Sequence, residues 1–170
     1  TQGQGKNTSH WFPSFDDVNE KVIFNLSIAY DKNYTVLANG ILNNFKTVTT
    51  GNNKLWFYEM QKPMSSYLLA IAIGKFVVKK QTSVSGIPLE MYLDINDKEH
   101  YETTYQHTKK MFDFLEKEIS VKYPWGIYRQ VPVKDFLYAG MENTTLTIFS
   151  QDFVVDQIGV NDKDYINVNA

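Results

Sequence analysis

The 170-residue sequence contains no cysteine, which excludes both a disulfide framework and a thiolate metal site. It also has no long hydrophobic run. The longest candidate, residues 67–76, is much shorter than the ~18 apolar residues of a membrane-spanning helix, so we expect no membrane span. The compartment stays open between the cytoplasm and a bacterial cell envelope, because exported bacterial proteins can also lack cysteine.

An excess of one charge is absent as well. The 17 basic and 19 acidic residues are interspersed and give a formal net charge of -2. Such a balance provides no basic surface for nucleic acid and no acidic tail, so we expect no nucleic-acid partner. With 43% hydrophobic residues, the chain can bury a core as one domain or as two small ones.

The first half of the sequence shows the two-residue alternation of half-buried strands. One face of such a strand would carry Val22, Phe24, Leu26, Ile28 and Tyr30. Turn signals at Asn39-Gly40 and Gly51-Asn52 predict antiparallel hairpins. Residues 66–76 are so continuously apolar that we expect one central strand buried on both faces. A further turn at Ser85-Gly86 suggests a boundary between two domains, residues 1–86 and 87–170.

After Asp94 the hydrophobic period changes to three and four, which predicts a helix of about 22 residues. Its apolar stripe would consist of Tyr101, Tyr105, Thr108, Phe112, Leu115 and Ile119. Asn96 and Glu99 have the spacing of a capping box that begins such a helix. A strand over residues 128–133 follows and is interrupted by Pro132, so we expect it to be bent or at a sheet edge. The fold class is therefore a β-rich α+β fold.

The segment Ala139-Gly140-Met141-Glu142-Asn143 is the most informative one. Two small residues beside a carboxylate, at the start of a β-prone run, leave backbone amides and carbonyls accessible near one negative charge. An extended peptide can pair with such an edge as an added strand, and its terminal ammonium group can bind the carboxylate. The pattern favours a peptide partner with a free amino terminus.

The three histidines, His10, His100 and His107, do not form a metal site by spacing. The last two lie seven residues apart, or ~10 Å along a helix, whereas two helical zinc ligands need a spacing near four. Adjacent Asp16 and Asp17 would point to different sides, so we expect a turn or cap role for them.

The five-residue segment closely resembles the exopeptidase motif Gly-Ala-Met-Glu-Asn of the zinc metallopeptidase family that includes aminopeptidase N and leukotriene hydrolase. Further segments resemble the family in the same order: residues 1–4, 12–17, 64–76 and 123–125. Departures are Ser14 for the usual cysteine, Asp17 for the usual glutamate, and Ala139-Gly140 for Gly-Ala or Gly-Gly.

This resemblance implies a substrate-binding set of Gln4, Tyr138, Ala139, Gly140, Met141 and Glu142. Glu142 would bind the α-ammonium group of the substrate, and Gln4 would share that group. Ala139 and Gly140 would lie along the substrate backbone, while Tyr138 and Met141 would line the pocket around its first residue. No catalytic residue and no metal ligand is expected in this chain.

The resemblance also implies the end of a saddle-like β domain followed by the first β and α elements of a thermolysin-like catalytic domain. The family's His-Glu-x-x-His zinc motif is absent and would begin shortly after residue 170, so we expect a fragment that is inactive alone. Zinc would bind to the full-length parent and not to this chain. Self-association through apolar surface near Phe149 and on the helix stripe is a further expectation.

Two alternatives stay open at this point. A non-catalytic peptide-binding or scaffold relative could keep this fold after loss of the metal ligands. An epoxide hydrolase of the leukotriene branch would carry the same amine-binding carboxylate.

Overall fold

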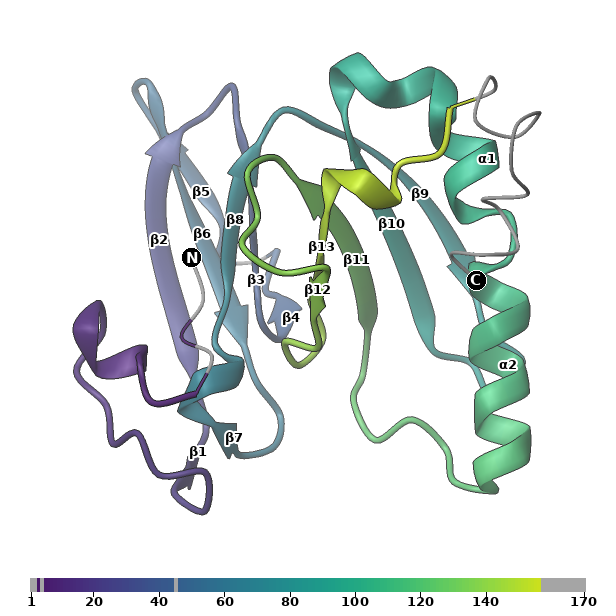
Figure 1. The fold of residues 1–170 in the computed structure, drawn as a ribbon. Coiled ribbons are helices and arrows are strands. Elements are labelled where there is room, and N and C mark those ends of the chain that lie inside the picture. The colour runs from purple at the N-terminus through teal and green to yellow at the C-terminus, as the bar shows by residue number, and fades with distance from the viewer. Residues whose placement is uncertain (1–2, 4, 45, 157–170) are drawn as a thin grey trace. The chain divides into compact units, whose positions relative to one another are not determined.

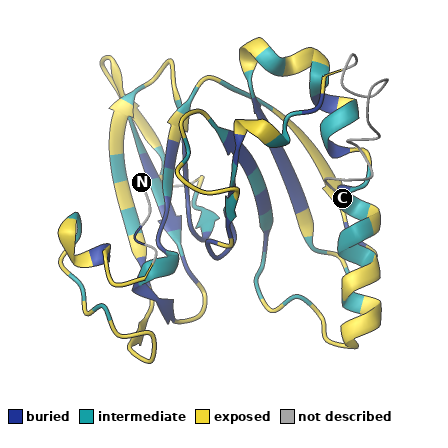
Figure 2. Ribbon diagram, viewed as in Figure 1, coloured by how far each residue is buried: buried dark blue, intermediate teal, exposed yellow. Residues whose placement is uncertain are grey.

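The computed structural model describes residue 3, residues 5–44 and residues 46–156. Short strands outnumber helices in this part of the chain (Figure 1), which confirms the predicted β-rich α+β fold. None of the helices in the described residues is long and apolar enough to cross a membrane. Buried residues concentrate on the strands (Figure 2).

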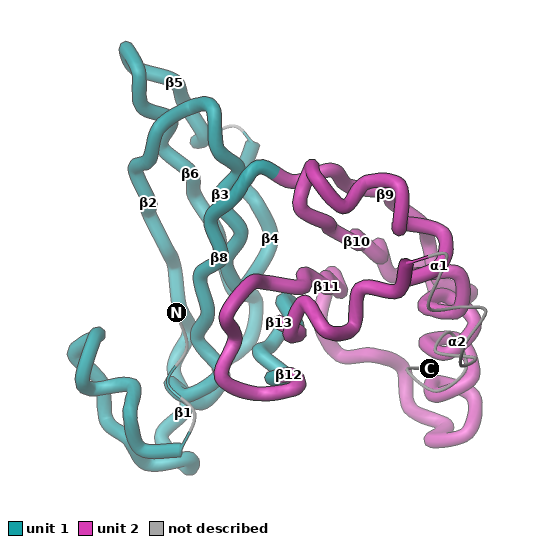
Figure 3. The backbone as a smooth tube through the Cα atoms, turned by 45° about the horizontal axis from the view of Figure 1, so that its top comes forward, with its two compact units in different colours: residues 1–75, 141–147 teal, residues 76–140, 148–170 magenta. Residues whose placement is uncertain are grey.

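The chain divides into two compact units (Figure 3). The first unit contains residues 1–75 and residues 141–147, and the second contains residues 76–140 and residues 148–170. The segment that follows Gly140 therefore returns to the first unit, although it is distant from that unit in sequence.

The first unit is built from short strands. They are β1 (Lys21–Val22), β2 (Asn25–Asp31), β3 (Thr35–Ala38), β4 (Ile41–Leu42), β5 (Val48–Thr50), β6 (Asn53–Glu59), β7 (Met64–Ser65) and β8 (Ile71–Gly74), with the 3-10 helices η1 (Thr8–His10) and η2 (Ser66–Leu68). In the largest sheet of this unit, β6 pairs antiparallel with β2, β4 and β5. Two separate antiparallel ladders join β3 to β8 and β1 to β7.

A hydrophobic core lies between β3 and β6. It consists of Val36, Ala38, Trp56 and Tyr58, with Leu26, Ile28, Leu42 and Ile71 packed against it. The Tyr58 hydroxyl donates a hydrogen bond of 2.7 Å to the Val36 carbonyl, so this buried polar group is satisfied. The alternation expected for residues 22–30 is confirmed for Leu26 and Ile28 of β2, which pack against the core. It is wrong at its ends, because Val22 belongs to β1 and is 49% exposed and Tyr30 is 41% exposed.

The hairpin predicted at Asn39-Gly40 is wrong. The two strands that flank it enter different ladders, because β3 pairs with β8 whereas β4 pairs with β6. Asn39 is fully buried, which is unusual for a hairpin turn. The hairpin predicted at Gly51-Asn52 is confirmed, since β5 and β6 pair with Thr50 opposite Asn53.

The single buried strand predicted over residues 66–76 is also wrong. Ser66–Leu68 forms η2, and β8 pairs with β3 alone and leaves Ile73 38% exposed. The Ser66 hydroxyl donates a hydrogen bond of 2.9 Å to the Phe15 carbonyl. Such side-chain bonds to the backbone favour a local turn over an extended ladder.

The second unit is a sheet with helices. Its elements are β9 (Phe76–Thr82), β10 (Pro88–Asp94), η3 (Ile95–His100), α1 (Tyr101–Tyr105), α2 (Thr108–Ile119), β11 (Tyr128–Val133), β12 (Gly140–Met141), β13 (Thr147–Ser150) and η4 (Gln151–Phe153). The strand order is β12-β13-β11-β10-β9. β10 pairs antiparallel with β9 and parallel with β11, so the helices form the crossover connection between two parallel strands.

Gly86, near the expected domain boundary, lies in the turn between β9 and β10 and has a φ of +93°. The two compact units divide earlier, after Lys75, because β9 pairs along seven residues with β10. The division into domains 1–86 and 87–170 stays a prediction.

β10 is the strand that is buried on both faces. Leu89, Met91 and Leu93 point to one face and form a core with Tyr101 and Tyr105 of α1. The Tyr105 hydroxyl donates a hydrogen bond of 2.7 Å to a backbone carbonyl of β10. Burial raises the pKa of Tyr105 well above its ordinary value, so this hydroxyl stays a protonated donor. The strand predicted over residues 128–133 is confirmed as β11, but it lies between β10 and β13 and not at an edge.

The predicted 22-residue helix is interrupted after Tyr105. Thr103 and Thr104 have low helix propensity, and their hydroxyls bond instead to the backbone carbonyl and amide of Val155. The predicted cap is also wrong, because Asp94 begins the helical segment and accepts a bond of 2.9 Å from the Asn96 amide.

Gly40 of the first unit and Gly86 of the second provide a matched test of packing around a glycine. Both have positive φ, +90° and +93°, but a Cβ at Gly40 would lie 2.5 Å from the Glu59 carbonyl oxygen, whereas one at Gly86 would meet nothing within 4 Å. We expect Gly86→Ala to lower the free energy of unfolding by about 1–2 kcal/mol through backbone strain alone. Gly40→Ala should lower the free energy of unfolding further, because the backbone at Glu59 must also move to make room for the Cβ. Urea unfolding followed by circular dichroism measures both, and equal losses would contradict the close contact.

Candidate functional site

The acidic residue of the five-residue motif is accessible. Met141 is 2% exposed and Asn143 is 1% exposed, whereas Glu142 between them is exposed. Within residues 3, 5–44 and 46–156, the structure gives the Glu142 carboxylate no hydrogen-bond or ion-pair partner. Backbone flanked by two buried side chains therefore presents one free carboxylate to solvent.

The arginine of the chain is paired within the second unit. Arg129 is the sole arginine in the sequence, and it is 2% exposed in β11. Its Nε atom donates a hydrogen bond of 2.9 Å to Glu90 Oε2 in β10. Glu142 itself is exposed and not enclosed in a core.

Two of the three residues 138–140 are exposed, and Gly140 is half-buried. Tyr138 is 43% exposed, and its ring meets the Phe136 ring edge to face with the centroids 6.2 Å apart. Ala139 is exposed and accepts a backbone hydrogen bond of 2.9 Å from Ser150. A Cβ at Gly140 would lie 2.9 Å from Cδ1 of Phe149, so a side chain at this position would have to displace that ring.

The segment after Glu142 is a buried turn. The Leu146 amide donates a hydrogen bond of 2.9 Å to the Asn143 carbonyl, which closes a four-residue turn. Thr145, the third residue of this turn, has a φ of +65° and is 3% exposed. Positive φ is a strained conformation for a β-branched residue. The Thr145 hydroxyl accepts a hydrogen bond of 2.7 Å from the Gly40 amide.

The side chain of Asn39 stabilises this turn through hydrogen bonds to the backbone. Its side chain is fully buried, and its Nδ2 atom donates to the Thr144 carbonyl at 2.5 Å and to the Leu68 carbonyl at 3.0 Å. Its Oδ1 atom accepts a bond of 2.7 Å from the Ala70 amide. Asn143 adds a second donor to the Leu68 carbonyl, at 3.2 Å.

Sequence reasoning missed Asn39, Thr145 and Leu68. The Asn-Gly pair was visible in the sequence, but it is also the commonest hairpin signal. The hydrogen bonds from Asn39 and Gly40 to Thr144 and Thr145 span 105 residues, and local periodicity carries no information on such contacts.

Gln4, expected to share the substrate amine, lies outside the described residues. The other resemblance segment near the amino terminus is ordered by capping bonds. Asp16 accepts bonds from the backbone amide and hydroxyl of Ser9, and Asp17 accepts a bond of 2.9 Å from the Asn19 amide. The turn and cap roles expected for these two carboxylates are confirmed.

The described part of the chain contains no group of three or more His, Cys, Asp or Glu side chains that could hold a metal ion. His100 precedes α1 and His107 precedes α2.

A buried ionic cluster crosses the centre of the second unit. Glu90 of β10 is 8% exposed and contacts Lys80 Nζ at 2.7 Å, Arg129 Nε at 2.9 Å and the Tyr92 hydroxyl at 2.8 Å. Burial raises the pKa of Glu90, but the bonds from Lys80, Arg129 and Tyr92 outweigh it and hold the pKa below the ordinary value. The cluster ties β9, β10 and β11 together.

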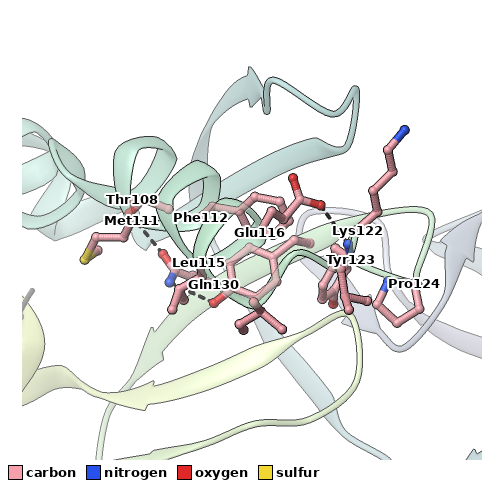
Figure 4. A pocket seen from close by; sticks show the side chains of 12 residues that line it. Thr108, Met111, Phe112, Leu115, Glu116, Lys122, Tyr123, Pro124 and Gln130 are labelled. Carbon is pink, nitrogen blue, oxygen red and sulfur yellow. Dashed lines mark hydrogen bonds between the residues drawn. The ribbon is translucent and has the colours of Figure 1, made fainter.

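A hollow of about 450 Å³ lies between α2 and β11 (Figure 4). Its walls are mostly apolar and include Phe112, Leu115, Ile119, Tyr123, Pro124 and Tyr128. Leu115 and Ile119, on the stripe predicted to face a core, are 54% and 64% exposed. The self-association expected from the sequence stays a prediction.

Comparisons with known proteins agree with these features. Residues 1–68 match the Peptidase M1 N-terminal domain, and residues 103–169 match the Peptidase family M1 domain. Glutamyl aminopeptidase of Rattus norvegicus is 32% identical over 140 residues, which cover 82% of this chain and 15% of that protein. Puromycin-sensitive aminopeptidase of Caenorhabditis elegans is 24% identical over 160 residues, 94% of this chain and 17% of that protein. The chain therefore belongs to peptidase family M1.

The family resemblance inferred from the five sequence segments is confirmed. Glutamyl aminopeptidase of Homo sapiens is likewise similar, at 31% identity over 82% of this chain. The chain spans only about 15% of the length of the glutamyl aminopeptidases that it matches. Peptidases of this family depend on zinc.

Proposed function

We propose that Glu142 binds the α-ammonium group of a peptide substrate in a full-length zinc aminopeptidase that contains this chain. The observation that carries the proposal is an exposed carboxylate that has no hydrogen-bond or ion-pair partner among the described residues and is held between two buried residues. A charge-assisted hydrogen bond between a carboxylate and an ammonium group is about twice as strong as a bond between neutral groups.

Such a contact explains removal of single residues from the amino end. Binding of the terminal ammonium fixes the distance from the amino terminus to the first peptide bond, so that bond alone reaches the metal. Positioning of this kind can lower a reaction barrier by several kcal/mol. Zinc would supply the Lewis acid that polarises the carbonyl, from ligands outside the described residues.

The residues around Glu142 would complete the substrate-binding surface. We propose that Ala139 and Gly140 lie along the substrate backbone, since Ala139 is exposed and Gly140 has no side chain in the way. Tyr138 would line the pocket for the first residue. Met141 was expected to line that pocket as well, but it is 2% exposed, so we propose that it supports the motif by packing. Gln4 would share the ammonium group. The proposed partner is a peptide with a free amino terminus.

The 170-residue chain alone should bind no catalytic zinc and hydrolyse no aminoacyl chromogenic substrate. The full-length protein should hydrolyse it, and a chelator should abolish that activity, since zinc is the expected Lewis acid. Chromogenic assays of both proteins, with and without added zinc, provide the test. Zinc-dependent turnover by the 170-residue chain would contradict the prediction that this chain alone is inactive.

A further inference from the structure

The Asn39-Gly40 pair is placed to hold the amine-binding segment. Both residues lie in the first unit, as do Glu142 and the turn that follows it. We use the name Asn39 cradle for Asn39, Gly40, Leu68 and Ala70, the residues that bond to one another or to that turn.

Asn39 uses both of its donor hydrogens on backbone carbonyls. One is donated to the Leu68 carbonyl at 3.0 Å and the other to the Thr144 carbonyl at 2.5 Å. The Oδ1 atom accepts a hydrogen bond of 2.7 Å from the Ala70 amide. The side chain is fully buried, so water does not compete for these bonds. An amide is the group that suits this site, because an aspartate at position 39 would point acceptors at two carbonyl oxygens.

The contact between Gly40 and Thr145 explains a strained residue. Type II turns need positive φ at their third residue and normally place glycine there. Thr145 occupies that position with a φ of +65°, and its hydroxyl accepts the Gly40 amide at 2.7 Å. Strained backbone of this kind persists only where the surroundings determine it, and it is concentrated at functional sites.

The cradle also reaches the residue next to Glu142. Asn143 Nδ2 donates to the Leu68 carbonyl at 3.2 Å, and Asn39 donates to the same oxygen. Leu68 ends η2, whose first residue, Ser66, is bonded to the Phe15 carbonyl. The backbone on the carboxyl side of Glu142 is therefore held by a continuous set of buried hydrogen bonds.

We propose that Asn39 is a positioning residue for amine recognition: through Thr144 and Leu68 it fixes the direction in which Glu142 presents its carboxylate. The inference rests on the proposed role of Glu142. Asn39 touches no substrate in this account. Small displacements of a positioned group cost large factors in rate, so loosening this turn should weaken the ammonium contact.

The test uses the full-length protein and two peptide-like inhibitors that differ only in the presence of the terminal amine. The ratio of their inhibition constants measures the contribution of the amine. We expect Glu142→Ala to reduce this ratio to near one. Asn39→Ala and Thr145→Val should each reduce it about fivefold or more, whereas Thr145→Ser, which keeps the hydroxyl, should leave it close to the wild-type value.

A double variant separates positioning from general destabilisation. If Asn39 acts through Glu142, Asn39→Ala should not lower the ratio further in the Glu142→Ala background. A loss of folded protein would lower the maximal rate but leave both inhibition constants, and therefore their ratio, unchanged. If Asn39→Ala does not fold, the comparison of Thr145→Val with Thr145→Ser decides.

The possible outcomes are distinct. An unchanged ratio in Glu142→Ala would overturn the proposed function itself. A ratio reduced by Glu142→Ala but unchanged in Asn39→Ala and Thr145→Val would leave the proposed function standing and overturn the role of the cradle.

Discussion

Replacement of Glu142 by alanine in the full-length protein should lower kcat/KM for peptides with a free amino terminus by about a hundredfold. The variant would leave the substrate ammonium without its charged acceptor, and hydrogen bonds to charged groups contribute about 1.5–3 kcal/mol, or roughly 10- to 150-fold. Because Glu142 is exposed and has no partner among the described residues, its removal should leave the fold unchanged. Steady-state kinetics and circular dichroism measure the two effects.

Two further variants sharpen this prediction. Glu142→Gln keeps the size of the side chain and removes the charge. Its kcat/KM should therefore lie between that of Glu142→Ala and that of the wild type. Glu118 is an exposed glutamate on α2, and Glu118→Ala serves as the control for loss of one surface carboxylate. Loss of activity in Glu118→Ala equal to that in Glu142→Ala would indicate a nonspecific charge effect and contradict the account.

The largest effect on stability is expected from Arg129→Met. Arg129 is 2% exposed, and its removal leaves the Glu90 carboxylate buried with fewer bonds. Breaking a buried ion pair on one side typically costs about 3–5 kcal/mol, so the free energy of unfolding of the 170-residue chain should fall by that order. Urea unfolding at pH 7 measures the change.

The double variant Glu90→Leu with Arg129→Met removes both charges and should recover most of the stability, because an apolar pair of similar volume often substitutes for a buried ion pair. Lys46→Met is the matched control, since Lys46 and Glu59 form a pair at 2.7 Å with side chains 58% and 40% exposed. Lys46→Met should lower the free energy of unfolding much less than Arg129→Met does, because the Lys46–Glu59 pair is exposed to solvent. If Arg129→Met were as mild as Lys46→Met, the structural role of the cluster would be wrong.

The same cluster gives stability a defined pH dependence. The pKa of Glu90 lies below its ordinary value in the folded chain, so its contribution is present above about pH 4.5 and is lost as the pH falls through the folded pKa. In Arg129→Met the pKa of Glu90 should rise, because the positive neighbour is gone. The acid limb of the stability curve should then begin at a higher pH.

Features of the fold that depend on local sequence were predictable. The alternation in β2, the turn at Gly51-Asn52 and the strand Tyr128–Val133 follow from residues within a few positions of each other. The helical segment after Asp94 was recognised, but its interruption was not. Just before the break, the Thr103 hydroxyl donates to the carbonyl of Val155 and the Thr104 hydroxyl accepts from its amide, and local sequence does not report contacts with a residue about 50 positions away.

The buried central strand shows why apolar content alone misleads. Residues 66–76 contain an unbroken apolar run from Tyr67 to Ile73, yet they form a 3-10 turn and a strand with one neighbour among the described residues. β10 carries Glu90 and is nevertheless buried on both faces, because Arg129 and Lys80 on the neighbouring strands neutralise it. The identity of a strand's neighbours decides such cases, and periodicity does not report it.

For the candidate site, the sequence pointed to the motif but not to its support. Glu142 was identified from its small neighbours and from the family resemblance. Asn39 lies more than 100 residues earlier, and its burial beneath the motif becomes visible only when both segments are brought together in the first unit. Support of a site by distant residues is a property of tertiary structure.

The most direct test is a crystal structure of the full-length protein with a bound peptide-like inhibitor that has a free amino terminus. We expect its ammonium nitrogen to lie about 2.7–2.9 Å from a carboxylate oxygen of Glu142, the range of charge-assisted hydrogen bonds. An ammonium group bound by other residues, with the Glu142 side chain still turned to solvent, would contradict the account.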